Sequence, residues 1–350
     1  MYQTFIPPTI LESLARNGVE SVIPTIQQST IKRISRASSM LMPQAASPRQ
    51  AVETSEIIVY DCEGTWQQRV KEVLRDRGLR RTTPEVVTGG SSDSAKTAFE
   101  YTKFTRDFLE EFLDRKGIDG QGGIIHVNVN YGVNYNNAFW DGDELTLGTG
   151  DNRVFTDFSK SLDVIAHEIG HGLVQFVSPL EYQGESGALN EHFADVLGSC
   201  VQAYKRRQAD LDPDWVIGNE IMGPDLYGET LRSMESPGTA YDHRLLGKDP
   251  QPSHYSNRYQ GDADHGGVHI NSGIMNKAFT IVAKKTNFRA AGEIWFAGLK
   301  RLWPTATFRD AEMMIVYEAR EKEKANALVR DESLTNLTQV VRAAFNEVGL

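Results

Sequence analysis

Apolar residues recur every three or four positions between residues 94 and 116, and Gly117 follows them. This spacing predicts an amphipathic helix that ends at the glycine. Residues 124–131 alternate instead, with apolar side chains at the odd positions and His126, Asn128 and Asn130 between them. A period of two predicts a half-buried strand. A second strand-like stretch covers residues 139–147, and Asp141-Gly142-Asp143 predicts a turn within it.

Beyond residue 160 the patterns are mostly helical. We expect helices over about 162–176, 188–205, 271–285, 289–302, 308–324 and 333–347. Strands therefore come first and helices follow, which indicates an α+β chain with a mostly helical second half. At 350 residues the chain is long for a single core, so two lobes, or one domain with an appended segment, are expected.

The first fifty residues have a pattern of their own. Phe5-Ile6-Pro7-Pro8 predicts a rigid, extended stretch, and Thr9 with Glu12 predicts a capping box at the start of a short helix. Polar and Ser-rich composition follows, and Ser47-Pro48-Arg49-Gln50 is typical of an exposed linker. Two interpretations are open: a floppy leader, or a small pro-segment followed by a cleavable joint.

Composition and charge narrow the classes of function. The chain has 37 Lys and Arg against 47 Asp and Glu, a net charge of −10, which disfavours a dedicated nucleic-acid binder. Two cysteines cannot form a disulfide framework. No stretch of about 18 apolar residues occurs, so no membrane span is expected. The start lacks the pattern of a secretory signal, so we expect a cytoplasmic location by default, with export by another route left open.

The candidate chemistry begins with His167-Glu168-Ile169-Gly170-His171, which lies inside the helix expected over 162–176. Residues i and i+4 share one helix face, so both imidazoles can bind one ion. This five-residue pattern arises by chance in on the order of one chain in a hundred. Taken alone, it could therefore also be two exposed histidines on a helix. Zinc in hydrolytic sites takes three protein ligands and keeps one position open, so a third ligand is needed.

Two downstream clusters offer further candidates. Glu191 and Asp195 are i and i+4 on the next helix, where Glu191 could bind the metal and Asp195 could accept the N–H of a ligand imidazole. Without the upstream pair, Glu191 would be a surface carboxylate. His192 lies roughly 100° around the helix from Glu191 and is not counted as a ligand. The glycines of Asp264–Gly273 predict a tight turn that brings His269 to a helix start, where it would by itself be a hydrogen-bonding residue.

Five motifs in this order resemble those of the thermolysin-like zinc metalloproteases: Asn137–Trp140, His167–His171, Tyr182–Asp195, Leu231–Met234 and Asp264–Gly273. The segment Ile6–Leu11 resembles the short precursor segment of the protealysin-like branch. The resemblance implies a two-lobed α+β fold, with a strand-rich N-terminal lobe, a mostly helical C-terminal lobe and the HExxH helix between them. The expected division is a pro-segment over residues 1–50, an N-terminal lobe over 51–176 and a helical lobe over 177–350.

The same resemblance implies catalytic roles. The zinc ligands would be His167, His171 and Glu191. Glu168 would be the general base, and Asp195 would be the partner of His167. Tyr182 and His269 would stabilise the tetrahedral oxyanion, with Asp264 orienting His269.

The resemblance also implies how a substrate is held. Asn137, the Ala138 backbone and Arg232 would bind the peptide. The pocket for the residue after the scissile bond would be lined by apolar side chains: Phe155, Phe158, Val164, Ile217 and Leu231. Cleavage before a bulky hydrophobic residue is therefore expected, although ordinary core packing is the alternative interpretation of these five positions.

The sequence departs from the family at the calcium positions. The family often binds two adjacent calcium ions through five acidic positions, which here are Asp163, Gln202, Asp214, Val216 and Asn219. Three of the five lack a carboxylate, and hard cations need oxygen ligands and charge. We expect this double site to be missing or much weakened, and a different calcium site is left open.

The resulting expectation is a zinc-dependent neutral endopeptidase that acts on proteins and peptides and is made as a zymogen. Its pro-segment would act as an intramolecular inhibitor, with the Ile6-Pro7-Pro8 stretch in the cleft and a cut near residues 45–52. Two rivals are a proteolytically inactive zinc-binding relative and an aminopeptidase. The base, both oxyanion donors and the peptide-holding residues favour the protease, and an aminopeptidase would need an acidic group for the substrate α-amine.

Overall fold

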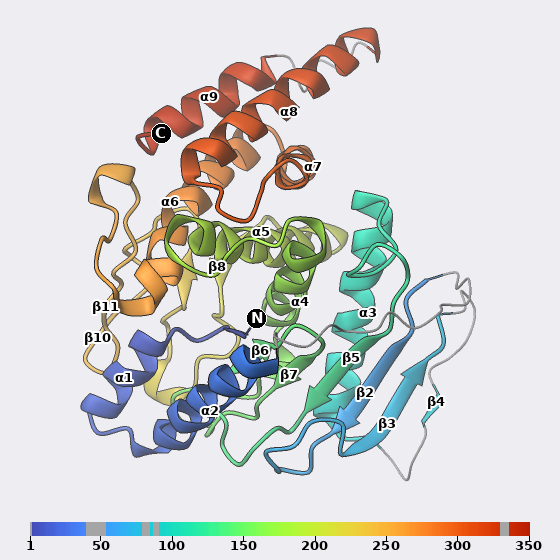
Figure 1. Cartoon of the computed structure of the whole chain (residues 1–350), viewed down its shortest axis with the longest axis vertical. Coiled ribbons are helices and arrows are strands. Elements are labelled where there is room, and N and C mark those ends of the chain that lie inside the picture. The colour runs from blue at the N-terminus through green and yellow to red at the C-terminus, as the bar shows by residue number, and fades with distance from the viewer. Residues whose placement is uncertain (1, 40–53, 79–84, 87–90, 330–335) are drawn as a thin grey trace. The chain divides into compact units, whose positions relative to one another are not determined.

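The computed structural model describes residues 2–39, 54–78, 85–86, 91–329 and 336–350 (Figure 1). The chain forms two compact units. The first runs up to Leu173 and includes Gly218–Glu229 and His243–Leu246; the second is Val174–Ile217, Thr230–Asp242 and Gly247–Leu350. The expected joint near 45–52 and the boundary at residue 50 lie outside the described residues.

Within the described residues, the first unit is built on a seven-stranded mixed sheet in the order β1-β6-β7-β5-β2-β3-β4. The strands are β1 (Gln3–Thr4), β2 (Ile57–Asp61), β3 (Lys71–Asp76), β4 (Glu85–Val86), β5 (Ile125–Val129), β6 (Ala138–Trp140) and β7 (Leu145–Leu147). The alternating segment predicted over 124–131 is β5, which pairs in parallel with β2 and β7. The turn at Asp141-Gly142-Asp143 joins β6 and β7 into an antiparallel hairpin, as expected.

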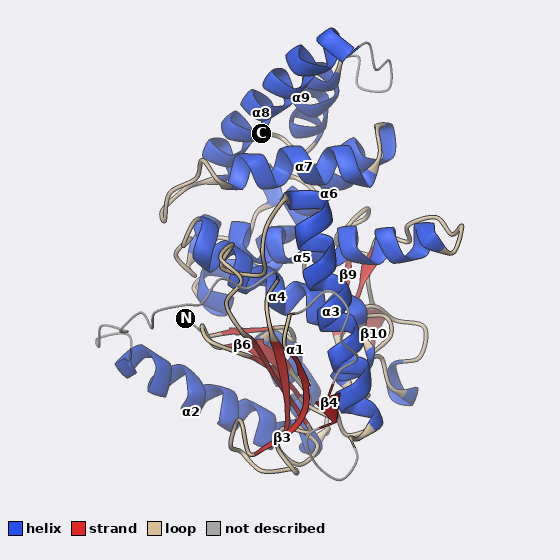
Figure 2. Ribbon diagram, turned by 90° about the vertical axis from the view of Figure 1, so that its right-hand side faces the viewer, coloured by secondary structure: helices blue, strands red, loops and turns tan. Residues whose placement is uncertain are grey.

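The helices of the first unit cover this sheet. Figure 2 shows α3 (Asp93–Leu113) along one face, with α2 (Ile23–Ser39) on the opposite side. Ser92 caps α3 through its hydroxyl, which accepts from the Ala95 amide, and the helix ends at Asp114 in a left-handed conformation. The last helix is α4 (Leu162–Val177), and the division between the units falls within it.

The leader contributes β1, α1 (Pro8–Arg16) and α2 to the first unit. The capping box expected at Thr9 and Glu12 is wrong, because α1 begins at Pro8 and has no side-chain cap. Proline suits the first helical position, since its fixed φ matches the helix and its missing N–H needs no partner there. The polar stretch after residue 27 is helical and its side chains bond to the unit, so the interpretation as a floppy leader is wrong for the described residues.

The second unit is mostly helical, as predicted. Its helices are α5 (Gly184–Gln208), α6 (Ala263–Lys285), α7 (Phe288–Leu299), α8 (Phe308–Val329) and α9 (Leu337–Glu347). Its core includes Trp295, which stacks on Phe345 and meets Phe279 edge to face. The short strands β8 (Val216–Ile217) and β9 (Arg232–Ser233) pair antiparallel. Among the described residues, the remaining short elements are β10 (Asp242–His243), β11 (Gly247–Lys248) and the 3₁₀ turns Glu20–Val22, Phe158–Lys160, Pro224–Leu226 and Tyr255–Asn257. None of the described helices is long and apolar enough to span a bilayer.

Candidate metal centre and active site

Helix α4 presents two imidazoles on one face. His167 and His171 are fully buried, and their ring centroids lie 4.6 Å apart at 87°. Glu168, between them in sequence, is also fully buried. Buried polar and charged groups are costly unless other groups compensate them, so three such side chains within one turn of this mostly apolar helix indicate a functional site.

Glu191 on α5 supplies the third donor. The ligand atoms of His167, His171 and Glu191 all lie within 4.8 Å of one another, and all three residues are buried. Two imidazole nitrogens with one carboxylate oxygen are a donor set that suits zinc in hydrolytic sites and leaves a coordination position open. The three residues named from the motif spacing therefore come together as a group that can hold one ion.

Tyr182 and His269 both reach Glu191 within the second unit. The Tyr182 hydroxyl donates to Glu191 Oε1 and lies 3.3 Å from His269 Nε2. His269 Nε2 is 3.4 Å from the same carboxylate oxygen. The two expected oxyanion donors thus lie beside a candidate metal ligand.

Asp264 fixes the orientation of His269. Its Oδ1 is 2.6 Å from His269 Nδ1, and its Oδ2 accepts from the His269 amide at 2.8 Å. The turn that makes this possible runs from Asp264 to Gly267 with positive φ throughout, at non-glycine residues too. Left-handed backbone is uncommon for residues with a Cβ, so this turn is strained, which is typical of functional sites.

The charge around His269 changes its protonation. Burial alone lowers the pKa of the imidazole, but the carboxylates of Glu191 and Asp264 outweigh it and raise the pKa to about 9. The carboxylates therefore favour a protonated ring, with N–H donors on both sides. A cation bound to Glu191 would weaken the largest of these raising interactions.

Asp195 and Arg232 form a buried ion pair in the second unit. Arg232 donates to Asp195 from Nε at 2.9 Å and from Nη2 at 2.8 Å. Asn276 on α6 also donates to Asp195, at 2.8 Å. Asn276 was missed from the sequence, where its one signal is its place seven residues after His269, on the same helix face. The expected contact between Asp195 and His167 stays a prediction.

Asn137 and Ala138, the expected peptide-holding residues, bind the leader of the same chain. Asn137 Oδ1 accepts from the Ile6 amide at 2.8 Å, and its Nδ2 donates to the Ile6 carbonyl at 3.2 Å. The Phe5 amide donates to the Ala138 carbonyl at 3.0 Å, next to the antiparallel pairing of β1 with β6. The Phe5 ring meets the His167 ring edge to face at 5.1 Å. The extended stretch expected over Phe5–Pro8 is wrong, because strand β1 ends at Thr4, the chain bends at Phe5 and Ile6, and α1 begins at Pro8. The bent segment lies against a candidate metal ligand.

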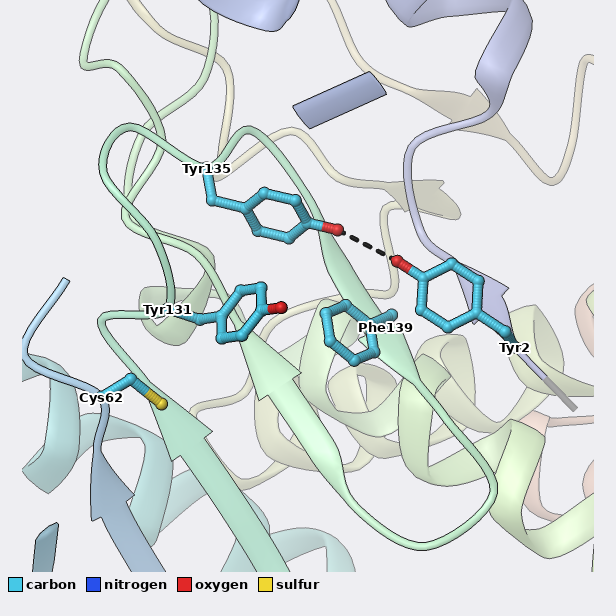
Figure 3. Close-up of a cluster of buried hydrophobic side chains, with 5 residues drawn as sticks. All are labelled: Tyr2, Cys62, Tyr131, Tyr135 and Phe139. Atoms are coloured by element: carbon cyan, nitrogen blue, oxygen red, sulfur yellow. Dashed lines mark hydrogen bonds between the residues drawn. The ribbon is translucent and has the colours of Figure 1, made fainter. Parts of the chain in front are cut away.

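An aromatic cluster holds the start of the leader. Figure 3 shows the Tyr2 hydroxyl hydrogen-bonded to that of Tyr135, beside Tyr131 and Phe139. The two hydroxyl oxygens are 3.2 Å apart. The Tyr2 and Phe139 ring centroids are 5.0 Å apart. Burial is the main reason why the pKa of Tyr2 lies well above its ordinary value, and burial also raises the pKa of Tyr135 to about 12.

The five expected pocket residues are all buried: Phe155, Phe158, Val164, Ile217 and Leu231. In the first unit the rings of Phe155 and Phe158 are 6.0 Å apart. In the second unit Ile217 pairs with Arg232 across β8 and β9. A lining of the substrate pocket by these residues stays a prediction.

Two of the positions at which the family binds calcium have hydrogen-bonding or ion-pair partners here. Asp163 Oδ2 accepts from the Gly218 amide at 2.7 Å, and Asp214 pairs with Arg206 at 2.8 Å. The calcium content of the protein stays a prediction.

Comparisons with known proteins identify the family. Residues 33–175 match the thermolysin metallopeptidase catalytic domain, and residues 178–350 match the thermolysin metallopeptidase alpha-helical domain. The chain is 34% identical over 333 residues to Protease PrtS of Photorhabdus sp. (strain Az29), covering 91% of this chain and 87% of that protein. It is 36% identical over 296 residues to an extracellular metalloprotease of Pectobacterium carotovorum subsp. carotovorum, covering 83% of this chain and 82% of that protein.

A solved structure is similar over almost the whole chain. The precursor of protealysin, a metalloproteinase from Serratia proteamaculans, matches with a TM-score of 0.79 and 30% identity, covering 99% of each chain. The mixed sheet followed by a helical unit agrees with this likeness. The chain belongs to the thermolysin family of metallopeptidases and is a metalloendopeptidase.

Proposed function

We propose that this protein is a zinc-dependent endopeptidase that cuts before bulky hydrophobic residues and is made as a zymogen. The observation that carries the proposal is the buried group of His167, His171 and Glu191, with Glu168 beside it in sequence. When bound there, zinc polarises the scissile carbonyl and lowers the pKa of the attacking water.

The side chains of the protein perform the proton transfers and hold the charge. Glu168 accepts the proton of the attacking water and passes it to the leaving amine. Tyr182 and His269 donate hydrogen bonds to the oxyanion as it develops. Asp264 keeps Nδ1 of His269 occupied, so that Nε2 is the nitrogen presented to the oxyanion.

The contacts of the leader support the proposed substrate geometry. The Asn137 side chain and the Ala138 carbonyl bind the backbone groups of Phe5 and Ile6, which every peptide has, so they suit a peptide substrate of varied sequence. Arg232 would hold a substrate carbonyl. A bulky apolar side chain, that of Phe5, lies beside His167, and this supports acceptance of such side chains near the metal.

Chelation tests the metal requirement. A chelator such as phenanthroline is expected to abolish casein hydrolysis by the processed enzyme, and added Zn²⁺ is expected to restore it. The measurement is the release of soluble peptides, compared with hydrolysis of amino-acid amides. Activity that survives metal removal would rule out the proposed mechanism, and hydrolysis confined to the amides would favour an aminopeptidase.

Truncation of His269 tests the oxyanion role. His269→Ala is expected to lower kcat by about a hundredfold or more, because a preorganised donor of this kind is typically worth about 3 kcal/mol. The zinc content should stay at the wild-type level, since His269 is outside the ligand group. Steady-state kinetics and elemental analysis measure the two effects. A kcat within threefold of wild type would remove His269 from the mechanism.

The leader is proposed to act as an intramolecular inhibitor. It places Phe5 and Ile6 on the residues that would bind a substrate, and both side chains are fully buried. Pro7 and Pro8 follow directly. A proline has a fixed φ and no amide hydrogen, so the bond after Ile6 is a poor substrate for an enzyme that binds regular extended backbone.

A further inference from the structure

A chain of buried polar side chains runs through the second unit behind the Asp195–Arg232 pair. The Trp295 indole on α7 donates to His192 Nε2 at 2.8 Å, and His192 Nδ1 is 2.7 Å from Asn276 Oδ1. Asn276 Nδ2 then donates to Asp195 Oδ2 at 2.8 Å. His192, Asn276 and Trp295 are all fully buried.

The donor and the acceptor of each hydrogen bond between Trp295 and Asp195 follow from the residues at the two ends of this series. An indole N–H can only donate, so His192 Nε2 must accept and carries no proton. The proton of the neutral ring is therefore on Nδ1, which donates to Asn276 Oδ1. The Asn276 amide nitrogen then faces Asp195, whose carboxylate accepts. A single arrangement of protons satisfies these three hydrogen bonds, and it ends at the carboxylate that holds Arg232.

We infer that His192 and Asn276 are positioning residues for Arg232, acting through Asp195. The inference rests on the proposed function, in which Arg232 binds the substrate peptide. Asp195 Oδ2 receives both Asn276 Nδ2 and Arg232 Nε, so the amide fixes the rotation of the carboxylate. That rotation sets the plane of the guanidinium, because Arg232 grips both carboxylate oxygens. Buried networks of this kind fix one geometry when every member is satisfied.

Substitutions at His192 test the required polarity. A glutamine amide has one acceptor and one donor, so His192→Gln can replace both hydrogen bonds, whereas His192→Leu removes both. We expect kcat/KM to fall about tenfold or more in His192→Leu and to stay within about threefold of wild type in His192→Gln. The loss should lie mainly in KM, since Arg232 binds the peptide. Equal losses in the two variants would show that the polarity does not matter and would overturn the inference.

A double-substitution cycle tests the route through Arg232. Asn276→Leu and Arg232→Lys are made singly and together, and kcat/KM is measured for a peptide substrate on the processed enzyme. If Asn276 acts through Arg232, the second substitution should reduce kcat/KM little beyond the first. If the fold-loss of the double variant equals the product of the two single fold-losses, the inference is overturned. Thr280→Val is the matched control, since it removes a buried hydroxyl one turn further along α6 that bonds to the Asn276 carbonyl. It should leave kcat/KM unchanged.

Thermal stability and the activity of the wild type separate the possible outcomes of these experiments. Thermal midpoints of all variants show whether a loss of activity is a loss of folding, and His192→Gln keeps the inference testable if the leucine variants do not fold. An active wild type with multiplying effects overturns this inference alone. A wild type that cuts no peptide, with zinc bound and the leader removed, overturns the proposed function and this inference with it.

Discussion

Replacing Glu168 with glutamine is expected to reduce peptide hydrolysis by about a hundredfold to ten-thousandfold, the range ascribed to general acid–base catalysis. Glutamine has nearly the shape of glutamate but cannot take a proton from water near neutral pH. Glu168 is fully buried on α4 between the two histidines in sequence, and it is not a member of the group that can hold the ion. The variant should therefore lose turnover and keep its metal.

Two measurements on the processed enzyme check this result: kcat/KM for a peptide, and zinc per chain by elemental analysis. The matched control is Glu144→Gln, which neutralises a buried carboxylate of the same unit that pairs with Arg69 at the β6–β7 turn. It should retain activity. If Glu168→Gln hydrolyses peptides as fast as wild type, then Glu168 is not the base. If it loses zinc as well as activity, the residue holds the metal site together instead.

The parts of the site that sequence could predict are those set by helical periodicity. His167 and His171, and likewise Glu191 and Asp195, are one helical turn apart, so their shared faces follow from spacing alone. The resemblance to the family then linked the two pairs. Helices α4 to α8 were predicted for the same reason, because each repeats its apolar residues locally over several turns.

Contacts between distant segments could not be predicted in this way. Strand β1 has two residues, and its pairing with β6 joins positions more than 130 residues apart. Helix α2 is polar and Ser-rich, and its contacts include Gln28 with Tyr131 and Ser29 with Tyr135. The polar chain from Trp295 to Asp195 draws on three helices, α5, α6 and α7, and no local pattern marks its members.

In the proposed function, the leader and a substrate compete for the same groups. Phe5 and Ile6 bond to the side-chain amide of Asn137 and to the carbonyl of Ala138, which are the groups proposed to bind a substrate backbone. Tyr2 adds an aromatic anchor against Phe139, outside the backbone contacts. Under the proposal, a substrate binds only when this segment leaves, and the affinity of the leader for the first unit would set the resting activity.

Cutting the joint and removing the leader is expected to raise activity by at least a hundredfold over the uncut chain. The comparison uses one protein, with a recognition sequence for an unrelated site-specific protease placed within residues 45–52, assayed before and after cleavage and separation. Added back, the purified leader should inhibit. Full activity in the uncut chain would show that the leader does not inhibit.

A single substitution in the leader should release part of this activity without any cut. Phe5 is fully buried, and truncating a buried phenylalanine typically costs about 3–5 kcal/mol. Since about 1.4 kcal/mol is a factor of ten, uncut Phe5→Ala should be at least about a hundredfold more active than the uncut wild type, up to the activity of the cut enzyme. Ile31→Ala is the matched control, because Ile31 lies on α2 of the same leader but is 59% exposed. An inactive Phe5→Ala chain that gains full activity on cleavage would place the inhibitory contact elsewhere in the leader.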